Sequence, residues 1–477
     1  MISALRPLLV FVAIAAIAAA LALRTPATTA GPQAPQLRPA VAMCFAPDTD
    51  PAYIAAVQQG LLDTMGATLE YNTTARWPGA VGTPVSLTYS FVPDGVETGQ
   101  GPNQLFDLMN QADFGGDANM NGKPDWQDLF RQMFDRWTEV TGNTYTEVSD
   151  DGAPWPTSSG SPGVRGDIRI VCAPNDGQGN IWAFNYFPGQ IQAGDMLIDA
   201  ADVFTIDLPT NNFRRFRNLI GHEHGHGQGL LHVCPDSTQS GGASKLMEPF
   251  IVSSYDGPQL DDILGSQALY GDRFEPNNSI ATAEPLESVG LESGVELVVS
   301  DISAHSISDA DLFSFEAESG SMVMNIQVAS QGFSYLEGDQ IGGVCQAGSL
   351  VNALEYTDLQ LELLNPSGAV IASSNAQGLG GIEEINSTIL PVDGVYTIRV
   401  RTSGSTFNGV QLYRLRATIE LAGIPGDFNG DGAVDGTDLA ILLSVWGTTG
   451  AGTGADLNGD GVVNGADLAA LLASWTG

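Results

Sequence analysis

Four of the five histidines of this 477-residue chain lie within eleven positions, and their spacing constrains the fold more than any other feature. The segment reads His-Glu-His-Gly-His-Gly-Gln-Gly-Leu-Leu-His over residues 222–232. On an α-helix His222 and His226 are one turn apart and face the same side, so both imidazoles can bind one metal ion. Gly229 can adopt a positive φ, which ends the helix and brings His232 back as a third ligand. The chain therefore needs a helix followed at once by a sharp turn.

Three histidine ligands indicate a catalytic zinc rather than a structural one, because structural zinc is closed by four protein ligands, often cysteines. Glu223 follows the first histidine and lies next to the position left open for water. There it is expected to take a proton from a zinc-bound water and later deliver it to the leaving amine. A chance cluster of histidines is the alternative that the spacing disfavours.

The pattern from 222 to 232, followed by Met247, resembles the zinc motif of the metzincin metalloendopeptidases and, within them, of the matrixins. Residues 244–249, Ser-Lys-Leu-Met-Glu-Pro, are similar to the family's Met-turn, which implies that Met247 forms the hydrophobic floor beneath the zinc. Residues 87–92, 137–141, 167–170 and 259–271 resemble the family's first strand, first helix, next strand and C-terminal helix. The resemblance covers about residues 77–271 and implies a zinc endopeptidase.

The local patterns of residues 77–271 independently favour an α+β domain. Alternating apolar residues predict a strand at 85–92, and apolar residues at helical spacing predict a helix at 127–141. Two further strands are expected at 167–172 and 180–186.

The chain also departs from the resembled family. Phe184 and Leu197 stand where two histidines of a second, structural zinc are expected, so one zinc is predicted. Asp195, Asp199 and Asp202 keep the spacing of the family's neighbouring calcium site, and both calcium binding and a solvated acidic surface stay open.

Two residues near the motif receive less specific roles. His224 projects from another side of the helix than His226, so a packed or solvent-facing imidazole is expected rather than a ligand. Ile251 replaces the tyrosine expected two positions after the Met-turn proline, which leaves the shape of the specificity pocket open.

Four cysteines allow two disulfides in three full pairings, and Cys172 with Cys234 is expected because both lie in one domain. Cys44-Phe-Ala-Pro47-Asp48 has the Cys-x-x-Pro-Asp spacing of the matrixin cysteine switch. Because the segment before it is too short for the usual prodomain, a disulfide partner or a spare thiol is expected instead. The four residues are Cys44, Cys172, Cys234 and Cys345.

The first segment has the pattern of a secretory signal. Arg6 precedes an uncharged apolar run at 8–23, and small residues near position 22 predict cleavage there, with cleavage after Ala30 as an alternative. An uncleaved anchor is the disfavoured alternative, because a membrane span usually needs ~18–20 apolar residues. Residues 1–22 (or to 30) are thus the predicted signal peptide, residues 31–76 a linker or short pro-segment, and the mature chain is expected to be secreted without a membrane span.

The charge of the chain excludes some partners. Eighteen Lys and Arg stand against 55 Asp and Glu, a formal charge of −37, so phosphate backbones and anionic membranes are repelled. Cations are the favoured partners, and no nucleic-acid partner is expected.

Residues 272–423 contain short alternating runs separated by Gly, Asn and Ser, which predict an antiparallel β-sandwich. Residues 272–283, 309–315 and 394–400 resemble the pre-peptidase C-terminal (PPC) sandwich of secreted bacterial peptidases. No tryptophan lies between 272 and 424, so a platform for stacking sugars is not evident, and a spacer or adhesion role is preferred.

Residues 424–477 contain two copies of Asp-x-Asn-Gly-Asp-Gly-x-Val-x-Gly-x-Asp-Leu, 29 residues apart. Each copy places oxygen ligands at positions 1, 3, 5, 9 and 12 and glycine at 6, as an EF-hand calcium loop does. A loop followed by one helix, twice, is similar to a type I dockerin, so a cohesin partner, a surface-retention role and a purely stabilising role stay open. The expected calcium ligands are Asp427, Asn429, Asp431, Asp435 and Asp438, and Asp456, Asn458, Asp460, Asn464 and Asp467.

A third loop shares this spacing and leads into the helix predicted at 127–141. The alternative is an ordinary turn with an N-cap aspartate, and calcium is favoured over it. The expected ligands are Asp117, Asn119, Asn121, Asp125 and Asp128.

The sequence thus predicts a multidomain protein with an α+β metzincin catalytic domain, an all-β sandwich and a small α-helical, calcium-binding dockerin-like module. The expected activity is hydrolysis of peptide bonds of extracellular proteins, with one catalytic Zn²⁺ and two or more structural Ca²⁺. The extended substrate is expected to pair with an edge strand at 180–184. The alternative is a calcium-dependent adhesion or scaffold protein with an inactive metzincin domain, which the intact Glu223 argues against. Polysaccharide hydrolysis is disfavoured, because no recognisable pair of acidic residues accompanies the zinc motif.

Overall fold

The structure is a computed structural model, and most of the chain between residues 41 and 477 is described in it. The predicted signal peptide, most of the predicted linker, and Asp117, Asn119 and Asn121 of the third loop lie outside the described residues. The described ranges are 41–46, 49–50, 53–54, 73–112, 125–156, 165–206, 212–234, 245–251, 253–317, 322–337, 340–341, 344–345, 348–403, 409–421, 424–449 and 454–477.

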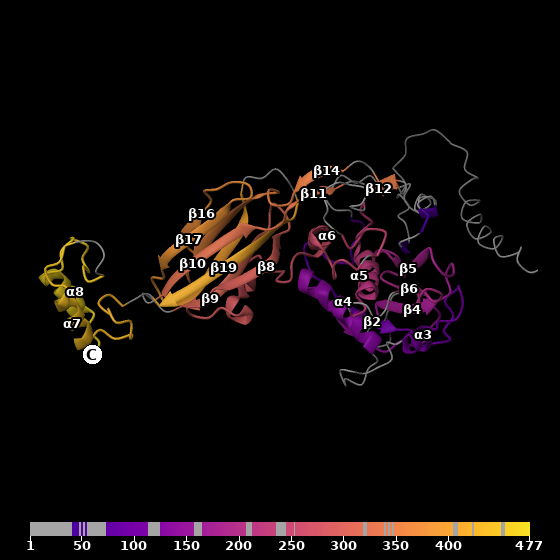
Figure 1. Ribbon diagram of the computed structural model, residues 1–477, viewed down its shortest axis with the longest axis horizontal. Coiled ribbons are helices and arrows are strands. Elements are labelled where there is room, and N and C mark those ends of the chain that lie inside the picture. The colour runs from indigo at the N-terminus through magenta and orange to yellow at the C-terminus, as the bar shows by residue number, and fades with distance from the viewer. Residues whose placement is uncertain are drawn as a thin grey trace, which may run out of the picture. The chain divides into compact units, whose positions relative to one another are not determined.

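A six-stranded sheet forms the framework of the first domain, in the order β1-β5-β6-β4-β2-β3. Its strands β5, β6, β4 and β2 are labelled in Figure 1. Strands β2, β3, β4 and β6 run parallel, whereas β5 is antiparallel to β6 and β1 is antiparallel to β5. All side chains of β4 are buried, as expected for a central parallel strand with both faces covered. The strands are β1 (Val41–Phe45), β2 (Ser86–Phe91), β3 (Thr144–Glu147), β4 (Ile168–Ala173), β5 (Ile181–Tyr186) and β6 (Met196–Asp199).

Two long helices carry much of the apolar core beside this sheet. The apolar stripe of α4 buries Phe130, Phe134 and Trp137, and the Trp137 indole N–H donates to the Gly221 carbonyl of α5 over 3.2 Å. Helix α4 therefore supports α5, the helix of the histidine motif. The helices are α3 (Leu105–Gln111), α4 (Asp125–Thr141), α5 (Arg214–Gln228) and α6 (Leu260–Tyr270).

The second region is a β-sandwich, as predicted. One sheet has the order β17-β10-β19-β8 and the other β16-β15-β18-β9-β7, and alternating apolar side chains from both sheets form a single core. Two short ladders, β11 with β14 and β12 with β13, complete the described strands. The strands are β7 (Glu284–Pro285), β8 (Leu297–Ala304), β9 (Ala310–Ala317), β10 (Met322–Ser330), β11 (Ser334–Glu337), β12 (Gln340–Ile341), β13 (Val344–Cys345), β14 (Ser349–Asn352), β15 (Asp358–Leu364), β16 (Val370–Ser374), β17 (Ile382–Ile389), β18 (Gly394–Ser403) and β19 (Gln411–Leu421).

The C-terminal module consists of two loop-helix units, with helices α7 (Gly436–Ser444) and α8 (Gly465–Ala473). In each helix a capping box closes the first turn. In α7 the box is formed by Asp435 and Asp438, and in α8 by Asn464 and Asp467. A small apolar core holds the two units together.

The predicted disulfide between Cys172 and Cys234 is wrong. Cys234 is disulfide-bonded, but Cys172 is a free, buried thiol on β4. Its surroundings in the apolar core favour a neutral thiol, and burial raises its pKa above the ordinary value. Sharing a domain was too weak a criterion, because a disulfide requires Cα atoms within about 7 Å. Among the described helices, none is long and apolar enough to cross a bilayer.

Candidate active site

Helix α5 presents the histidine motif and ends abruptly after it. Gly229 has φ 115°, and its N–H donates to the carbonyls of Gly225 and His226. A Cβ at Gly229 would lie 2.1 Å from the Ala75 carbonyl oxygen, so only glycine fits this turn. The turn brings His232 back to the helix, as the spacing predicted.

Three imidazoles converge at one point. The Nε2 atoms of His222 and His226 are 2.9 Å apart, and each lies 3.2 Å from Nε2 of His232. Nδ1 of His222 contacts the Leu246 carbonyl, and Nδ1 of His226 contacts the Leu230 carbonyl, both at 2.7 Å. A carbonyl accepts only, so each Nδ1 carries the proton and each Nε2 offers a lone pair.

This arrangement fits a metal ion better than hydrogen bonds among the three rings. With their protons on Nδ1, His222 and His226 have no hydrogen to share between their Nε2 atoms. A tetrahedral site with Zn–N bonds of ~2.0–2.1 Å places its nitrogens about 3.3–3.4 Å apart, close to the observed separations. Burial lowers the pKa of His222 to about 4, which favours the neutral form that a metal requires.

Glu223 is fully buried on the same helix turn, and neither carboxylate oxygen has a hydrogen-bonding partner among the described residues. Burial raises its pKa well above the ordinary value; the backbone N–H of Cys44 lies near the carboxylate and opposes this in part, but makes no hydrogen bond of ordinary geometry to it. An unpartnered, buried carboxylate costs folding free energy and marks a functional position. Its predicted role as general base remains a prediction.

Met247 packs directly beneath the helix. A Cβ at Gly225 would lie 2.5 Å from the Met247 sulfur, so the glycine allows the turn to approach α5 closely. Asp262 of α6 holds that turn, because its carboxylate accepts the N–H groups of Leu246 and Met247 at 2.7 and 3.0 Å. No local pattern singles out Asp262, since its partners lie about fifteen residues away in the chain.

His224 belongs to the core and not to the three-histidine group. Its ring makes edge-on contacts with Phe134 and Tyr145, each with ring centroids 4.8 Å apart. Burial lowers its pKa to about 3, so it is neutral. Of the two surroundings expected for it, the packed one is correct.

The predicted linker at 31–76 contains a strand. Residues 41–45 form β1 and pair with β5, the strand that the sequence had marked as the edge. Cys44 is a free thiol and fully buried, so of the two states expected for it the spare thiol is correct and the disulfide is wrong. Its Sγ lies with ligand atoms of His222 and Glu223 in a group whose members are within 4.8 Å of one another.

At the two positions where the resembled family has histidines of a second zinc site, this chain has apolar side chains that pack in the core. Phe184 and Leu197 lie in a buried cluster with Trp155 and Val171. The ring of Phe184 lies 6.2 Å from that of Trp155 and 5.9 Å from that of Tyr186, measured between centroids.

Asp195, Asp199 and Asp202 are fully buried, so the alternative of a solvated acidic surface is wrong. Asp199 accepts four backbone N–H groups, from residues 175, 176, 177 and 201, and Asp202 accepts that of Gly179. Asp195 accepts the N–H of Arg169, and burial raises the pKa of Asp195 well above its usual range. Calcium binding there remains a prediction.

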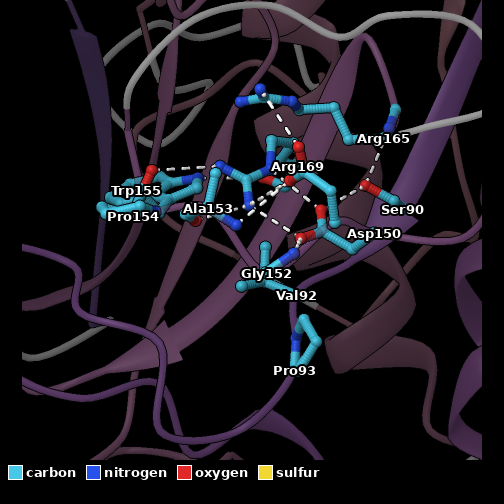
Figure 2. A network of polar contacts seen from close by, with 12 residues as sticks. Ser90, Val92, Pro93, Asp150, Gly152, Ala153, Pro154, Trp155, Arg165 and Arg169 are labelled. Carbon is cyan, nitrogen blue, oxygen red and sulfur yellow. Dashed lines mark hydrogen bonds and ion pairs between the residues drawn. The ribbon is translucent and has the colours of Figure 1, made fainter.

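A buried ion pair near this sheet was not foreseen. Figure 2 shows the guanidinium of Arg169 on β4 facing the carboxylate of Asp150, with donor-acceptor distances of 2.8 and 2.9 Å. The same guanidinium donates to the carbonyls of Ala153 and Pro154 and so holds this loop against the sheet. Burial raises the pKa of Asp150, but the hydrogen bonds of Arg169 and Ser90 outweigh it and lower that pKa. The sequence signal for this ion pair is the single arginine within the apolar strand at 168–173.

Replacing Arg169 by Met is expected to lower the free energy of unfolding by roughly 3 kcal/mol, because Asp150 keeps its buried charge without its cation. The measurement is denaturant unfolding followed by tryptophan fluorescence. Arg136→Met is the matched control in the same domain, since its contact with Asp256 is largely exposed and is expected to contribute about 0–1 kcal/mol. Equal effects of the two substitutions would contradict the prediction.

The two C-terminal loops have the same internal hydrogen bonding. In the first, Asp438 accepts the N–H groups of Phe428, Asn429 and Asp435, and these donors lower its pKa. In the second loop, Asp467 accepts the corresponding N–H groups of residues 458 and 464. The remaining predicted ligands make hydrogen bonds within the same two turns. They are Asp427, Asn429, Asp431 and Asp435 in the first loop, and Asp456, Asn458, Asp460 and Asn464 in the second.

Of the third predicted loop, only Asp125 and Asp128 are described. Both lie in the first turn of α4, and the Asp128 carboxylate accepts a hydrogen bond from Nε of Arg131 over 2.9 Å. Their calcium role stays a prediction.

Two family models match the chain. Residues 116–271 match the model described as Matrixin, and residues 425–473 match the type I dockerin domain.

Curated relatives match over part of their length. The chain is similar to matrix metalloproteinase-16 of Homo sapiens, with 31% identity over 170 residues that cover 32% of this chain and 26% of the relative. Stromelysin-1 of Mus musculus is 30% identical over 204 residues, covering 36% of this chain and 40% of the relative. Stromelysin-3 of Mus musculus is 30% identical over 169 residues, covering 34% and 29%.

Two solved structures align with less than a third of the chain. They are PliG, a periplasmic inhibitor of g-type lysozyme from Aeromonas hydrophila (13% identity, 29% of this chain and 95% of that chain, TM-score 0.19), and the pre-peptidase C-terminal domain of collagenase from Bacillus anthracis (17%, 29% and 93%, TM-score 0.17). Scores this low establish no shared fold.

Proposed function

We propose, from the matrixin domain and the type I dockerin domain that this chain contains, that it is a secreted zinc endopeptidase cutting extracellular proteins. The observation that carries the proposal is the meeting of three Nε2 lone pairs beside the unpartnered carboxylate of Glu223. Similarity to matrix metalloproteinases supports a metalloendopeptidase, although the matched segments cover well under half of those relatives.

The chain's own residues divide the work of peptide hydrolysis. His222, His226 and His232 would hold zinc, which supplies Lewis-acid polarisation of the scissile carbonyl and of water. Glu223 takes a proton from the attacking water and delivers it to the nitrogen of the leaving amine. The carbonyls of residues 230 and 246 fix the ring orientation of two ligands, and Met247 fills the space beneath them.

The domain division belongs to the same proposal. Residues 1–22 (or to 30) act as signal peptide, 31–76 as a linker or short pro-segment, 77–271 as peptidase domain, 272–423 as sandwich and 424–477 as dockerin module. The disulfide at Cys234 supports export, because disulfides form and persist in oxidising compartments.

The dockerin module is proposed to bind two calcium ions and to attach the enzyme to a cohesin or to another surface partner. In both loops, the carboxylates and amides predicted as ligands surround one short turn, which supports cation binding.

Replacing Asp438 by Asn is expected to weaken calcium binding at the first loop by at least about tenfold, because the ligand at position 12 loses its charge. The second loop keeps Asp467 and is expected to bind as before. Calorimetric titration of the full chain checks this, with one site weakened in the variant relative to the wild type and the other sites unchanged. Asp438→Asn binding like the wild type would contradict the ligand assignment.

The test of the enzymatic proposal is digestion of an unfolded protein by the purified chain with zinc, with a chelator, and with zinc restored. Internal cuts that disappear with the chelator and return with zinc are expected. If one zinc binds per chain and no protein is cut after the N-terminal segment is removed, the rival adhesion or scaffold role replaces the enzyme.

A further inference from the structure

The N-terminal strand β1 lies between two backbone segments beside the histidine group. On one side it pairs antiparallel with β5 through five residue pairs, from Val41 opposite Tyr186 to Phe45 opposite Ile181. On the other side the Phe45 N–H donates to the Pro249 carbonyl over 3.0 Å, and Phe45 bridges the next residue in parallel. Residues 41–46 therefore lie between β5 on one side and residues 249–250 on the other.

This is the geometry of a bound extended peptide. Peptides that bind by strand addition gain affinity from main-chain hydrogen bonds and specificity from pockets for alternate side chains. Without β1, strand β5 would form the edge of the sheet, and it contains the residues with which a substrate is expected to pair. The chain thus places its own residues where a substrate strand would lie.

The register brings one peptide bond to the catalytic residues. Cys44 lies opposite Ala183, and its Sγ is grouped with His222 and Glu223 within 4.8 Å. It is not grouped with the other two histidines, so the thiol is on the Glu223 side of the site and not central to the three Nε2 atoms. The backbone N–H of Cys44 is also near enough to the Glu223 carboxylate to lower the pKa of that carboxylate.

We propose that residues 41–46 occupy the cleft in the register of a substrate, with the Met43–Cys44 peptide bond at the position of the bond that is cut. The proposal rests on the proposed peptidase function. Hydrolysis there breaks the C–N bond, water gives its hydroxyl to the Met43 carbonyl carbon, and Glu223 carries the proton to the Cys44 nitrogen.

The bound segment also indicates the class of substrate. The side chain after the cut bond takes the place of the Cys44 side chain, which is fully enclosed and small. The next side chain takes the place of Phe45, which is buried against Ile54 and Ile181. Preferred substrates are therefore extended peptides with a small apolar residue after the cut bond, followed by a large apolar one.

The first test measures hydrogen exchange of residues 41–46 by mass spectrometry in the metal-free full chain. Cys44→Ala is expected to keep the wild-type protection, whereas Cys44→Phe is expected to speed exchange at least tenfold because the ring does not fit. Met43→Phe is the size-matched control at the neighbouring position and is expected to keep protection. Equal exchange in Cys44→Ala and Cys44→Phe would contradict the claim that only a small side chain fits at position 44. Circular dichroism verifies that each variant folds.

The alternative occupant of the metal's fourth position is the thiolate itself. If the thiol held the segment through zinc, Cys44→Ala would release residues 41–46 in zinc-loaded protein, and that outcome would overturn the substrate-like register. The register predicts instead that zinc does not change the difference between wild type and Cys44→Ala.

The second test is the site of self-cleavage in zinc-loaded full chain, read by mass spectrometry of the new termini. A cut between Met43 and Cys44 is expected in wild type and Cys44→Ala, and at least tenfold slower in Cys44→Phe. A cut elsewhere in 41–46, or none in protein that digests an added unfolded substrate, would refute the register. If nothing at all is digested, the proposed function fails, and the exchange measurement on metal-free protein still decides whether position 44 requires a small side chain.

Discussion

Replacing Glu223 by Gln is expected to lower kcat by about 10²–10⁴-fold, the usual contribution of a general acid-base group. The amide has the size of the carboxylate but cannot take a proton from water. KM and zinc content are expected to stay near the wild-type values, because Glu223 is not one of the three histidines. Steady-state kinetics on a quenched-fluorescence peptide, with zinc measured in the same samples, checks this.

A second readout separates catalysis from folding. The Glu223 carboxylate is buried without a hydrogen-bonding partner, so the neutral amide removes a desolvation cost and the variant is expected to unfold at no lower temperature than wild type. Glu248→Gln is the matched control, because Glu248 is also buried near the site but lies outside the three-histidine group. A Glu223→Gln enzyme with unchanged kcat would refute the assigned role.

Sequence patterns were most informative where several constraints coincide locally. The helix with its glycine-terminated turn could be predicted because histidine spacing, helix geometry and positive φ all apply within eleven residues. The apolar stripe of α4 and the repeated C-terminal loops were readable for the same reason, since each is a short-range periodicity.

The features that were missed depend on contacts between residues far apart in the chain. Strand β1 is only five residues long, and nothing local indicates that it pairs with residues 181–186. The free state of Cys172 depends on which strand lies beside β4, and the role of Asp262 depends on a turn fifteen residues away. Polar groups of this kind can be recognised as unusual in a sequence, but their partners are decided by the tertiary fold.

Replacing His226 by Ala is expected to weaken zinc binding by at least on the order of 100-fold, and to abolish proteolysis at ordinary zinc concentrations. Structural zinc in small domains contributes ~10–16 kcal/mol through four ligands, about 3 kcal/mol for each. His226, like His222, lies close to both other rings, since its Nε2 is 2.9 Å from that of His222 and 3.2 Å from that of His232. Equilibrium dialysis followed by elemental analysis measures the loss.

His224→Ala is the control that separates the loss of a zinc ligand from a general defect of helix α5. His224 is equally buried on α5, two residues away, but its ring packs against Phe134 and Tyr145. Its removal leaves a cavity and lowers the unfolding temperature, yet zinc binding is expected to persist. Because a ligand that binds only the folded state stabilises it, added zinc should raise the unfolding temperature of wild type and His224→Ala but not of His226→Ala. If both variants lose zinc equally, the cluster's metal site depends on helix integrity and not on the convergence of three Nε2 atoms.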